Sequence, residues 1–283
     1  MKMGIKDWLK KAKEELYSKQ LWKSLRAEFF GSILYVIFGC GCTTNWTNDT
    51  VVKLFASVLS FGISYSILVK TLGPTSGGHF NPAVTISLLC TRYISLLRGL
   101  FYILVQIIGS ICGAAILYGI IPSEIRHDLG VTKVHKNVDN VRAFGVEFLA
   151  MFIVIFTYFS NLENKNNVLV PESVVCGLSI SLSQLFAFNL TGASVNPARS
   201  FGPALIHNSW ENHWIYWVGP ILGGIFGGFT HEYTNKHSTD LQNYQTSLRQ
   251  HVYSLQRKED GASSNSIATE LACDQEPIEE LQI

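Results

Sequence analysis

The stretches Gly77-Gly78-His79-Phe80-Asn81-Pro82-Ala83 and Gly192-Ala193-Ser194-Val195-Asn196-Pro197-Ala198 decide the fold, because they repeat one pattern within a single chain. Asparagine is a favoured helix N-cap and proline is favoured at the first helical position, so each Asn-Pro-Ala tripeptide predicts the start of a helix. The apolar runs that follow, Ala83–Cys90 and Ala198–Ile206, are short. Crossing a hydrocarbon core of about 30 Å takes about 20 residues. We therefore expect two half-helices that enter a membrane only part of the way.

The composition is that of a membrane protein. Hydrophobic residues make up 47% of the chain and charged residues only 15%, and most of the charge lies near the two ends. A soluble two-domain protein does not carry a long succession of apolar runs without a charged face. The fold class expected is an all-α membrane protein with six transmembrane helices and two re-entrant half-helices. The six apolar runs of membrane length are Leu25–Cys42, Val51–Val69, Leu96–Ile120, Phe144–Phe159, Ser173–Leu190 and Trp214–Phe229.

The placement of lysine and arginine predicts the orientation in the membrane. A cluster of lysines precedes the first span, and cytoplasmic segments carry an excess of basic residues, so the N-terminus is expected in the cytoplasm. Six spans return the C-terminus to the same side, most simply in the plasma membrane. The connection after the third span holds Arg126, Lys133 and Lys136 and lies outside, which runs mildly against the rule. Glu28, within the first span, argues against a cleaved signal peptide.

The chain is an internal repeat. Glu28 precedes Asn81 in the first copy, and Glu147 precedes Asn196 by about the same distance in the second. With three spans in each copy, the second copy must enter the membrane from the opposite side, which gives an inverted pair. The division expected is a cytoplasmic N-terminal arm (1–24), a first pore repeat (25–120), an extracellular connecting loop (121–141), a second pore repeat (142–234) and a largely disordered cytoplasmic tail (235–283).

Two half-helices that enter from opposite faces point their N-terminal ends at each other. Unpaired N–H groups and about half a positive charge per helix then converge near the midplane. Non-helical backbone survives at membrane depth only where it is buried or lines water. If the side-chain oxygens of Asn81 and Asn196 cap their helices, their amide N–H groups face a lumen as donors, which orients water, repels cations and interrupts proton relay. The pore-lining positions expected beside them are Gly77, Gly78, His79, Gly192 and Ser194.

The chain resembles the aquaporin family, the major intrinsic proteins, and most closely its orthodox animal type. The resemblance runs from Leu25 to about Tyr233, and the segments that carry it are Ser76–Thr85, Thr191–Ala204 and Trp210–Pro220. It implies a passive water channel that assembles as a homotetramer with one pore in each subunit. Selectivity in such channels comes from pore diameter, from lining donors and acceptors, and from an arginine or the half-helix dipoles.

The resemblance assigns an outer selectivity filter to Phe61, Gln184, Ala193 and Arg199. Gln184 stands where water-selective members usually have histidine. Glutamine donates and accepts hydrogen bonds as neutral histidine does, but it is flexible, so the constriction is expected to open wider. An insect branch that is altered at this position passes glycerol and urea. Ser200 favours water, because glycerol channels of the usual type have aspartate there.

Three functions remain open from the sequence: a channel for water, a channel for water with small uncharged solutes such as glycerol or urea, and a junctional or adhesive membrane protein with a vestigial pore. The resemblance also implies that Glu28 and Glu147 brace the re-entrant loops. The sequence contains no paired carboxylates, metal cluster or activated nucleophile, so neither an enzyme, a cofactor, a metal nor a nucleic-acid partner is expected.

The remaining candidate sites are peripheral. Asn45 and Asn48 lie in glycosylation sequons of the first outer loop, and Ser95 ends a basophilic kinase motif. Leu281–Ile283 is a weak candidate ligand for a PDZ groove. The stretch Ile5–Leu16 predicts either an amphipathic helix on the inner leaflet or a solvated arm.

Overall fold

The computed structural model describes residues 5–44, 49–124, 126, 128–163 and 170–234, and within these ranges every regular element is a helix. Residues 1–231 form one compact unit, to which all contacts described below belong. Asn45, Asn48, the tail 235–283 and its end Leu281–Ile283 lie outside the described residues. The helices are α1 (Ile5–Leu16), α2 (Lys19–Gly41), α3 (Thr50–Ser76), α4 (Pro82–Cys90), α5 (Leu96–Ile120), α6 (Asn140–Glu163), α7 (Glu172–Thr191), α8 (Pro197–His207) and a further helix at 215–234.

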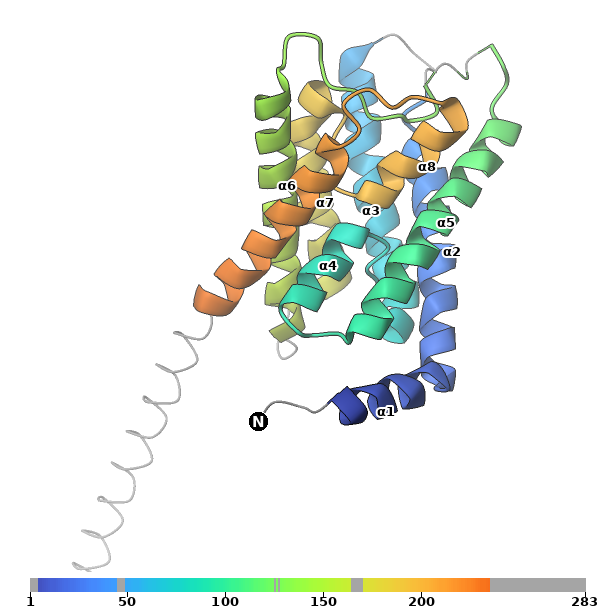
Figure 1. The fold of residues 1–283 in the computed structure, drawn as a ribbon. Helices are drawn as coiled ribbons and strands as arrows, with labels where there is room; N and C mark the ends of the chain where they lie inside the picture. Colours follow the sequence, from blue (N-terminus) through green and yellow to red (C-terminus); the bar gives the residue numbers. More distant parts are fainter. Residues whose placement is uncertain (1–4, 45–48, 125, 127, 164–169, 235–283) are drawn as a thin grey trace, which may run out of the picture. The chain divides into compact units, whose positions relative to one another are not determined.

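Six long helices surround two short ones in this unit. Helix α3 packs against α7, α2 against α5 and α3, and α6 against α7. The short helices α4 and α8 both contact α5, and Figure 1 shows one of them in each half of the bundle. The predicted class, six spans with two half-helices, is therefore the fold observed.

Within the described ranges, four helices are long and apolar enough to cross a membrane by length and composition alone: α3, α5, α6 and α7. The other two long helices carry polar residues within the bundle. Helix α2 contains the fully buried Glu28, and the helix at 215–234 is rich in glycine and contains the buried His231. Polar groups that are buried within the bundle do not face lipid, so they are compatible with a span.

Some helices extend beyond the expected spans: α3 continues past Val69 to Ser76, and α2 starts before Leu25. Helix α2 begins at Lys19 instead of Leu25, because Ser18 caps it: the Ser18 hydroxyl accepts from Gln20 N at 3.2 Å and from Leu21 N at 3.4 Å. The expected arm at 1–24 therefore contains α1 and the first residues of α2. Hydropathy marks the part of a helix that lies in lipid, whereas the helix itself extends to its caps.

In each half of the chain, the long helix that precedes the half-helix ends in the same way. Helix α3 is followed by Gly77 with φ 98°, and α7 by Gly192 with φ 79°. This left-handed conformation is easily adopted only by glycine, and it terminates a helix. Each glycine leads into a short loop and then into a half-helix, so the local backbone follows the same pattern in both halves of the chain.

Candidate functional site

The half-helices begin at the asparagines that the sequence predicts as caps. Asn81 Oδ1 accepts from Ala83 N at 2.8 Å. Asn196 Oδ1 accepts from Ala198 N at 3.0 Å and from Arg199 N at 3.2 Å. Both asparagines have extended backbone and are followed by proline, the pattern of a side-chain N-cap.

The same two asparagines join the half-helices to each other. Asn81 Nδ2 donates to the carbonyl of Val195 at 2.8 Å, and Asn196 Nδ2 donates to the carbonyl of Phe80 at 2.9 Å. These carbonyls turn across because Phe80 and Val195 have φ values of 47° and 43°. Each amide thus uses one N–H on the opposite loop, whereas the sequence suggested that the amide N–H groups of both asparagines would face a lumen. Asn81 Nδ2 also lies 3.9 Å from the sulfur of Met151, a weak acceptor.

Two buried glutamates hold the loops that precede the half-helices. Glu28 and Glu147 are both 0% exposed, and each carboxyl also accepts a hydroxyl hydrogen bond at 2.6 Å, from Ser76 and Thr191 respectively. Each carboxyl accepts two successive backbone N–H groups at 2.7–3.0 Å, those of His79 and Phe80 in the first half and of Ser194 and Val195 in the second. These backbone bonds satisfy N–H groups that would otherwise be unpaired at membrane depth.

Arg199 and Phe61 meet at the start of α8. The guanidinium carbon of Arg199 lies 4.7 Å from the centre of the Phe61 ring, within the range of a cation–π contact. Arg199 Nη1 donates to the carbonyl of Gly130, in the connection between α5 and α6. Arg199 is only 2% exposed, and its Nε has no hydrogen-bond partner among the described residues. This leaves a buried N–H donor beside an aromatic ring.

Gln184 and Ala193, the other two predicted filter residues, contact each other directly. Gln184 Nε2 donates to the carbonyl of Ala193 at 3.1 Å, and Gln184 Oε1 accepts from the hydroxyl of Ser57 at 2.6 Å. Gln184 is 0% exposed. Both ends of the Gln184 amide are therefore bonded in this structure, a restraint that the sequence alone did not indicate.

The first loop, at 77–79, is contacted by tyrosines that the sequence reasoning did not single out. The carbonyl of Gly77 accepts from Tyr158 at 2.9 Å, and that of Gly78 accepts from Tyr65 at 3.2 Å. These carbonyls, expected to face a lumen, keep one lone pair each. Helical spacing is the signal that was available: Ser57, Phe61 and Tyr65 recur every four residues and so share one face of α3.

His79 and Ser194 occupy corresponding positions, and both side chains bond within the protein. His79 Nδ1 lies 3.0 Å from the Thr85 hydroxyl, at the start of α4. The Ser194 hydroxyl donates to Asn196 O at 3.1 Å and accepts from Ser200 at 2.6 Å. The Ser194 hydroxyl is therefore directed into a polar network instead of standing free.

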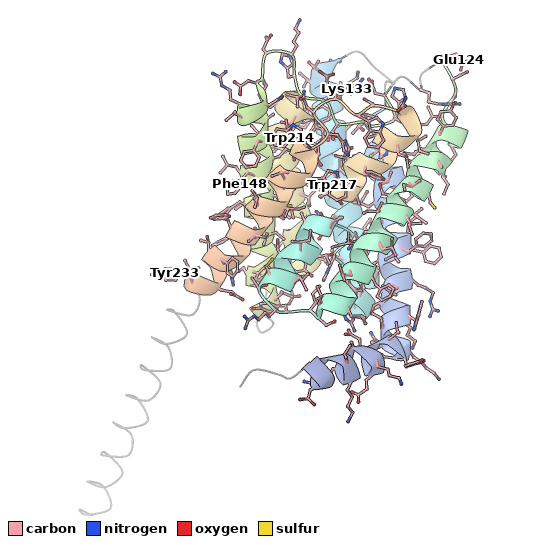
Figure 2. All side chains as sticks on the ribbon, in the orientation of Figure 1. Glu124, Lys133, Phe148, Trp214, Trp217 and Tyr233 are labelled. Carbon is pink, nitrogen blue, oxygen red and sulfur yellow. The ribbon has the colours of Figure 1, made fainter. Side chains whose placement is uncertain are left out.

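The connection between α5 and α6 covers the start of α8. Besides the bond from Arg199 to Gly130 O, the Thr132 hydroxyl donates to Ser200 at 2.9 Å, and His135 N donates to Leu190 O at 2.8 Å. Figure 2 shows Glu124 and Lys133, from this connection, at the same end of the unit as Trp214. Arg199 and the start of α8 thus lie beneath the connection between α5 and α6.

Ser95 caps α5 at the opposite end. Its hydroxyl accepts from Arg98 N at 3.1 Å and donates to Glu15 of α1. Glu15 also pairs with Arg98 at 2.9 Å. The candidate modification residue therefore sits in the contact between α1 and α5. Among the described residues, no group of three or more His, Cys, Asp or Glu side chains is arranged to hold a metal ion.

Two capped half-helices joined end to end inside a helical bundle define a membrane channel of one family. Residues 15–231 match the model of that family, described as MIP, major intrinsic protein, and the chain belongs to it. This is a family of membrane channels for water and small solutes, not of enzymes.

Individual relatives agree with the family match. The chain is 43% identical over 222 residues to aquaporin-4 of Mus musculus, which covers 77% of this chain and 69% of that protein. It is 40% identical over 220 residues to the lens fiber major intrinsic protein of Lithobates pipiens, covering 77% and 83%. The X-ray structure of the aquaglyceroporin from Plasmodium falciparum matches with a TM-score of 0.71 at 20% identity, covering 78% of this chain and 99% of that one. At that identity the structural match shows the fold alone.

Proposed function

We propose that this protein is a passive water channel whose conduit passes between the N-terminal ends of α4 and α8. The observation that carries the proposal is the reciprocal pair of hydrogen bonds from Asn81 to Val195 O and from Asn196 to Phe80 O. These bonds fix both asparagine amides at the junction. Each amide has a second N–H, and that of Asn81 has only the weak acceptor Met151 Sδ at 3.9 Å. A water molecule at the junction accepts from these donors, so its hydrogens point away from the centre.

Ion and proton exclusion follow from the same arrangement. The two helix N-termini and Arg199 place positive potential along the path, which opposes a cation that has lost part of its hydration. A water molecule whose oxygen is held by fixed donors cannot relay a proton along the file. In this proposal the filter consists of Phe61, Gln184, Ala193 and Arg199, and the narrow path beyond it passes the Asn-Pro-Ala motifs.

A second candidate function is a channel for water together with glycerol or urea. It is favoured by one observation, the glutamine at position 184 in place of the usual histidine. The two hydrogen bonds that hold Gln184 reduce its freedom, but its carboxamide still offers different polar groups from those of an imidazole ring. In this second candidate function, Gln184 is the filter residue that widens the solute range.

Swelling measurements separate these functions. Oocytes or proteoliposomes that contain the protein are exposed to a hypotonic medium and then to isotonic glycerol and urea. We expect osmotic water permeability well above that of empty membranes. Absence of water flux would refute the channel and favour a junctional protein with a vestigial pore. Solute flux in the wild type that Gln184→His abolishes would establish the second function, and water flux alone would exclude it. Gln20→His, the same change at an exposed position, is the matched control.

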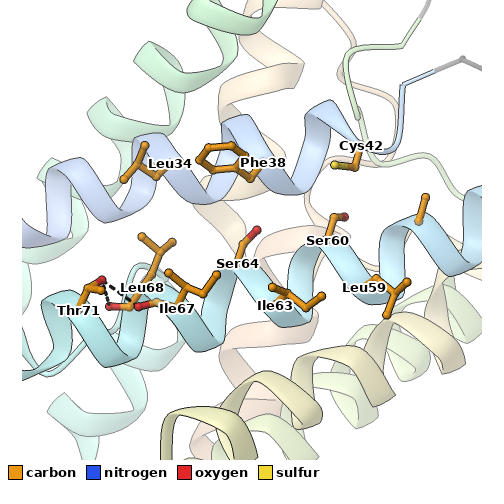
Figure 3. Close-up of a pocket in the computed structure, with 11 residues that line it drawn as sticks. Leu34, Phe38, Cys42, Leu59, Ser60, Ile63, Ser64, Ile67, Leu68 and Thr71 are labelled. Atoms are coloured by element: carbon orange, nitrogen blue, oxygen red, sulfur yellow. Dashed lines mark hydrogen bonds between the residues drawn. The ribbon is translucent and has the colours of Figure 1, made fainter.

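The proposal also includes the assembly and orientation of the chain. We propose a homotetramer in the plasma membrane with both termini cytoplasmic. Figure 3 shows an apolar groove between α2 and α3, lined by residues that include Leu34, Phe38 and Ile63, a surface available to lipid or to a neighbouring subunit. Native mass spectrometry should give four times the subunit mass, and a single-subunit mass would contradict the tetramer. Loss of glycosylation in Asn45→Gln or Asn48→Gln would support an outer first loop.

A further inference from the structure

Ser57 is a buried polar residue on the same face of α3 as Phe61, one helical turn earlier. It is 0% exposed, and its hydroxyl donates to Gln184 Oε1 at 2.6 Å. A buried hydroxyl with a single long-range polar partner on another helix is well suited to orient that partner. The residue was not among those that the sequence pointed to.

The direction of the Gln184 amide follows from its two partners. The carbonyl of Ala193 only accepts hydrogen bonds, so the NH2 end of Gln184 must face it. The oxygen end must then face Ser57, whose hydroxyl has to donate. An amide flip would place NH2 against Ser57 and oxygen against the Ala193 carbonyl, which would leave two acceptors in contact. The carboxamide therefore has one orientation.

The amide in turn supports a strained residue. Ala193 has φ 47°, in the left-handed region that residues other than glycine rarely adopt. Its N–H donates to Thr191 Oγ1 at 3.2 Å and its carbonyl accepts from Gln184. Ser57, Gln184 and Ala193 thus form a chain of hydrogen bonds from α3 to the loop before α8, which we term the filter clamp.

We propose that Ser57 is a positioning residue for permeant selection: by holding the oxygen of Gln184 against α3, it leaves the filter with donors and withholds an acceptor. The bond to Ala193 takes one of the two N–H groups of Gln184, and Arg199 Nε–H has no partner among the described residues. A water molecule or a urea carbonyl accepts from such donors. A polyol must also donate its hydroxyl hydrogens, and the Gln184 oxygen is turned away from it. The inference rests on the proposed channel function.

The test compares glycerol and water permeability in Ser57→Ala. Without the hydroxyl, the buried Gln184 oxygen loses its partner, and the carboxamide turns to offer that oxygen to the permeant. We expect the ratio of glycerol to water permeability to rise about fivefold, the effect of one hydrogen bond of ordinary strength. Ser64→Ala is the matched control, because Ser64 lies on the same helix but lines the apolar groove between α2 and α3. Its ratio should not change.

A double variant separates positioning from general packing. In a Gln184→His background, Ser57→Ala should leave the ratio unchanged, because the amide on which Ser57 acts is absent. Provided that the wild type conducts water, two results would overturn the inference: the same rise of the ratio in both backgrounds, or no rise in the wild-type background. Absence of water permeability in the wild type would instead overturn the proposed function. If Ser57→Ala does not reach the membrane, Ser57→Cys, similar in size and a weak donor, must raise the ratio.

Discussion

Glu147→Gln tests whether the loop before α8 depends on a single buried carboxyl group. One oxygen of Glu147 accepts from the Thr191 hydroxyl at 2.6 Å and from Ser194 N at 2.9 Å, and the other accepts from Val195 N at 2.9 Å. An amide has only one oxygen. Whichever way the glutamine turns, at least one buried backbone N–H faces an NH2 group and has no acceptor.

The magnitude follows from that single lost bond. An unsatisfied buried donor costs about 1–3 kcal/mol, so we expect the free energy of unfolding to fall by about 2 kcal/mol. The loss falls on a strained segment, since Ala193 and Val195 have φ values of 47° and 43°. Residues in such conformations persist only when their surroundings hold them. Relaxation of Val195 also withdraws the carbonyl that holds Asn81, so water permeability should fall as well.

The assay has two parts. SDS titration of detergent-solubilised protein gives the change in stability, and stopped-flow light scattering of proteoliposomes gives the water permeability per reconstituted channel. Glu28→Gln should behave alike, because Glu28 holds His79 and Phe80 in the same way. The exposed Glu211→Gln is the control. If Glu147→Gln has the same stability and water permeability as that control, the loop before α8 does not depend on the Glu147 carboxyl group.

Three further changes have defined outcomes. Asn196→Ala removes the N-cap of α8 and the hydrogen bond to Phe80 O, so the free energy of unfolding should fall by about 2 kcal/mol, the sum of a cap and a hydrogen bond. A change near zero in SDS titration would show that these bonds do not join the half-helices. Tyr65→Phe frees the Gly78 carbonyl, so water permeability by stopped flow should rise, and a fall would show that the hydroxyl assists permeation. Ser95→Asp keeps a cap but repels Glu15, so α1 should become more accessible to proteases than in Ser95→Asn; equal accessibility would argue against the contact.

The sequence predicts those parts of the structure that depend on local signals. Both half-helices start at the predicted prolines, Pro82 and Pro197, because cap and proline act within one turn. Helix α5 spans Leu96–Ile120 as predicted, since Ser95 caps the start of its apolar run. The start of α2 at Lys19 was missed, because that helix continues beyond the apolar stretch to its cap.

Contacts between distant segments could not be predicted from the sequence. The bond between Ser57 and Gln184 joins residues 127 positions apart, and nothing in either local pattern indicates it. The cross-bonds of Asn81 and Asn196 likewise require φ values above zero at Phe80 and Val195, which these residue types do not predict. Local chemistry therefore gave the helix starts, and tertiary packing determined where the amide groups point.

Mercurial block of a cysteine variant tests most directly whether water passes between the two half-helices. Ala193 is one of the proposed filter residues, and its carbonyl accepts from Gln184 at 3.1 Å. In proteoliposomes, we predict that a mercurial barely affects wild-type water permeability but blocks Ala193→Cys, and that added thiol reverses the block. The mercurial could instead label the introduced thiol of Ala193→Cys and leave its water permeability unchanged. That result would contradict a path between the two half-helices.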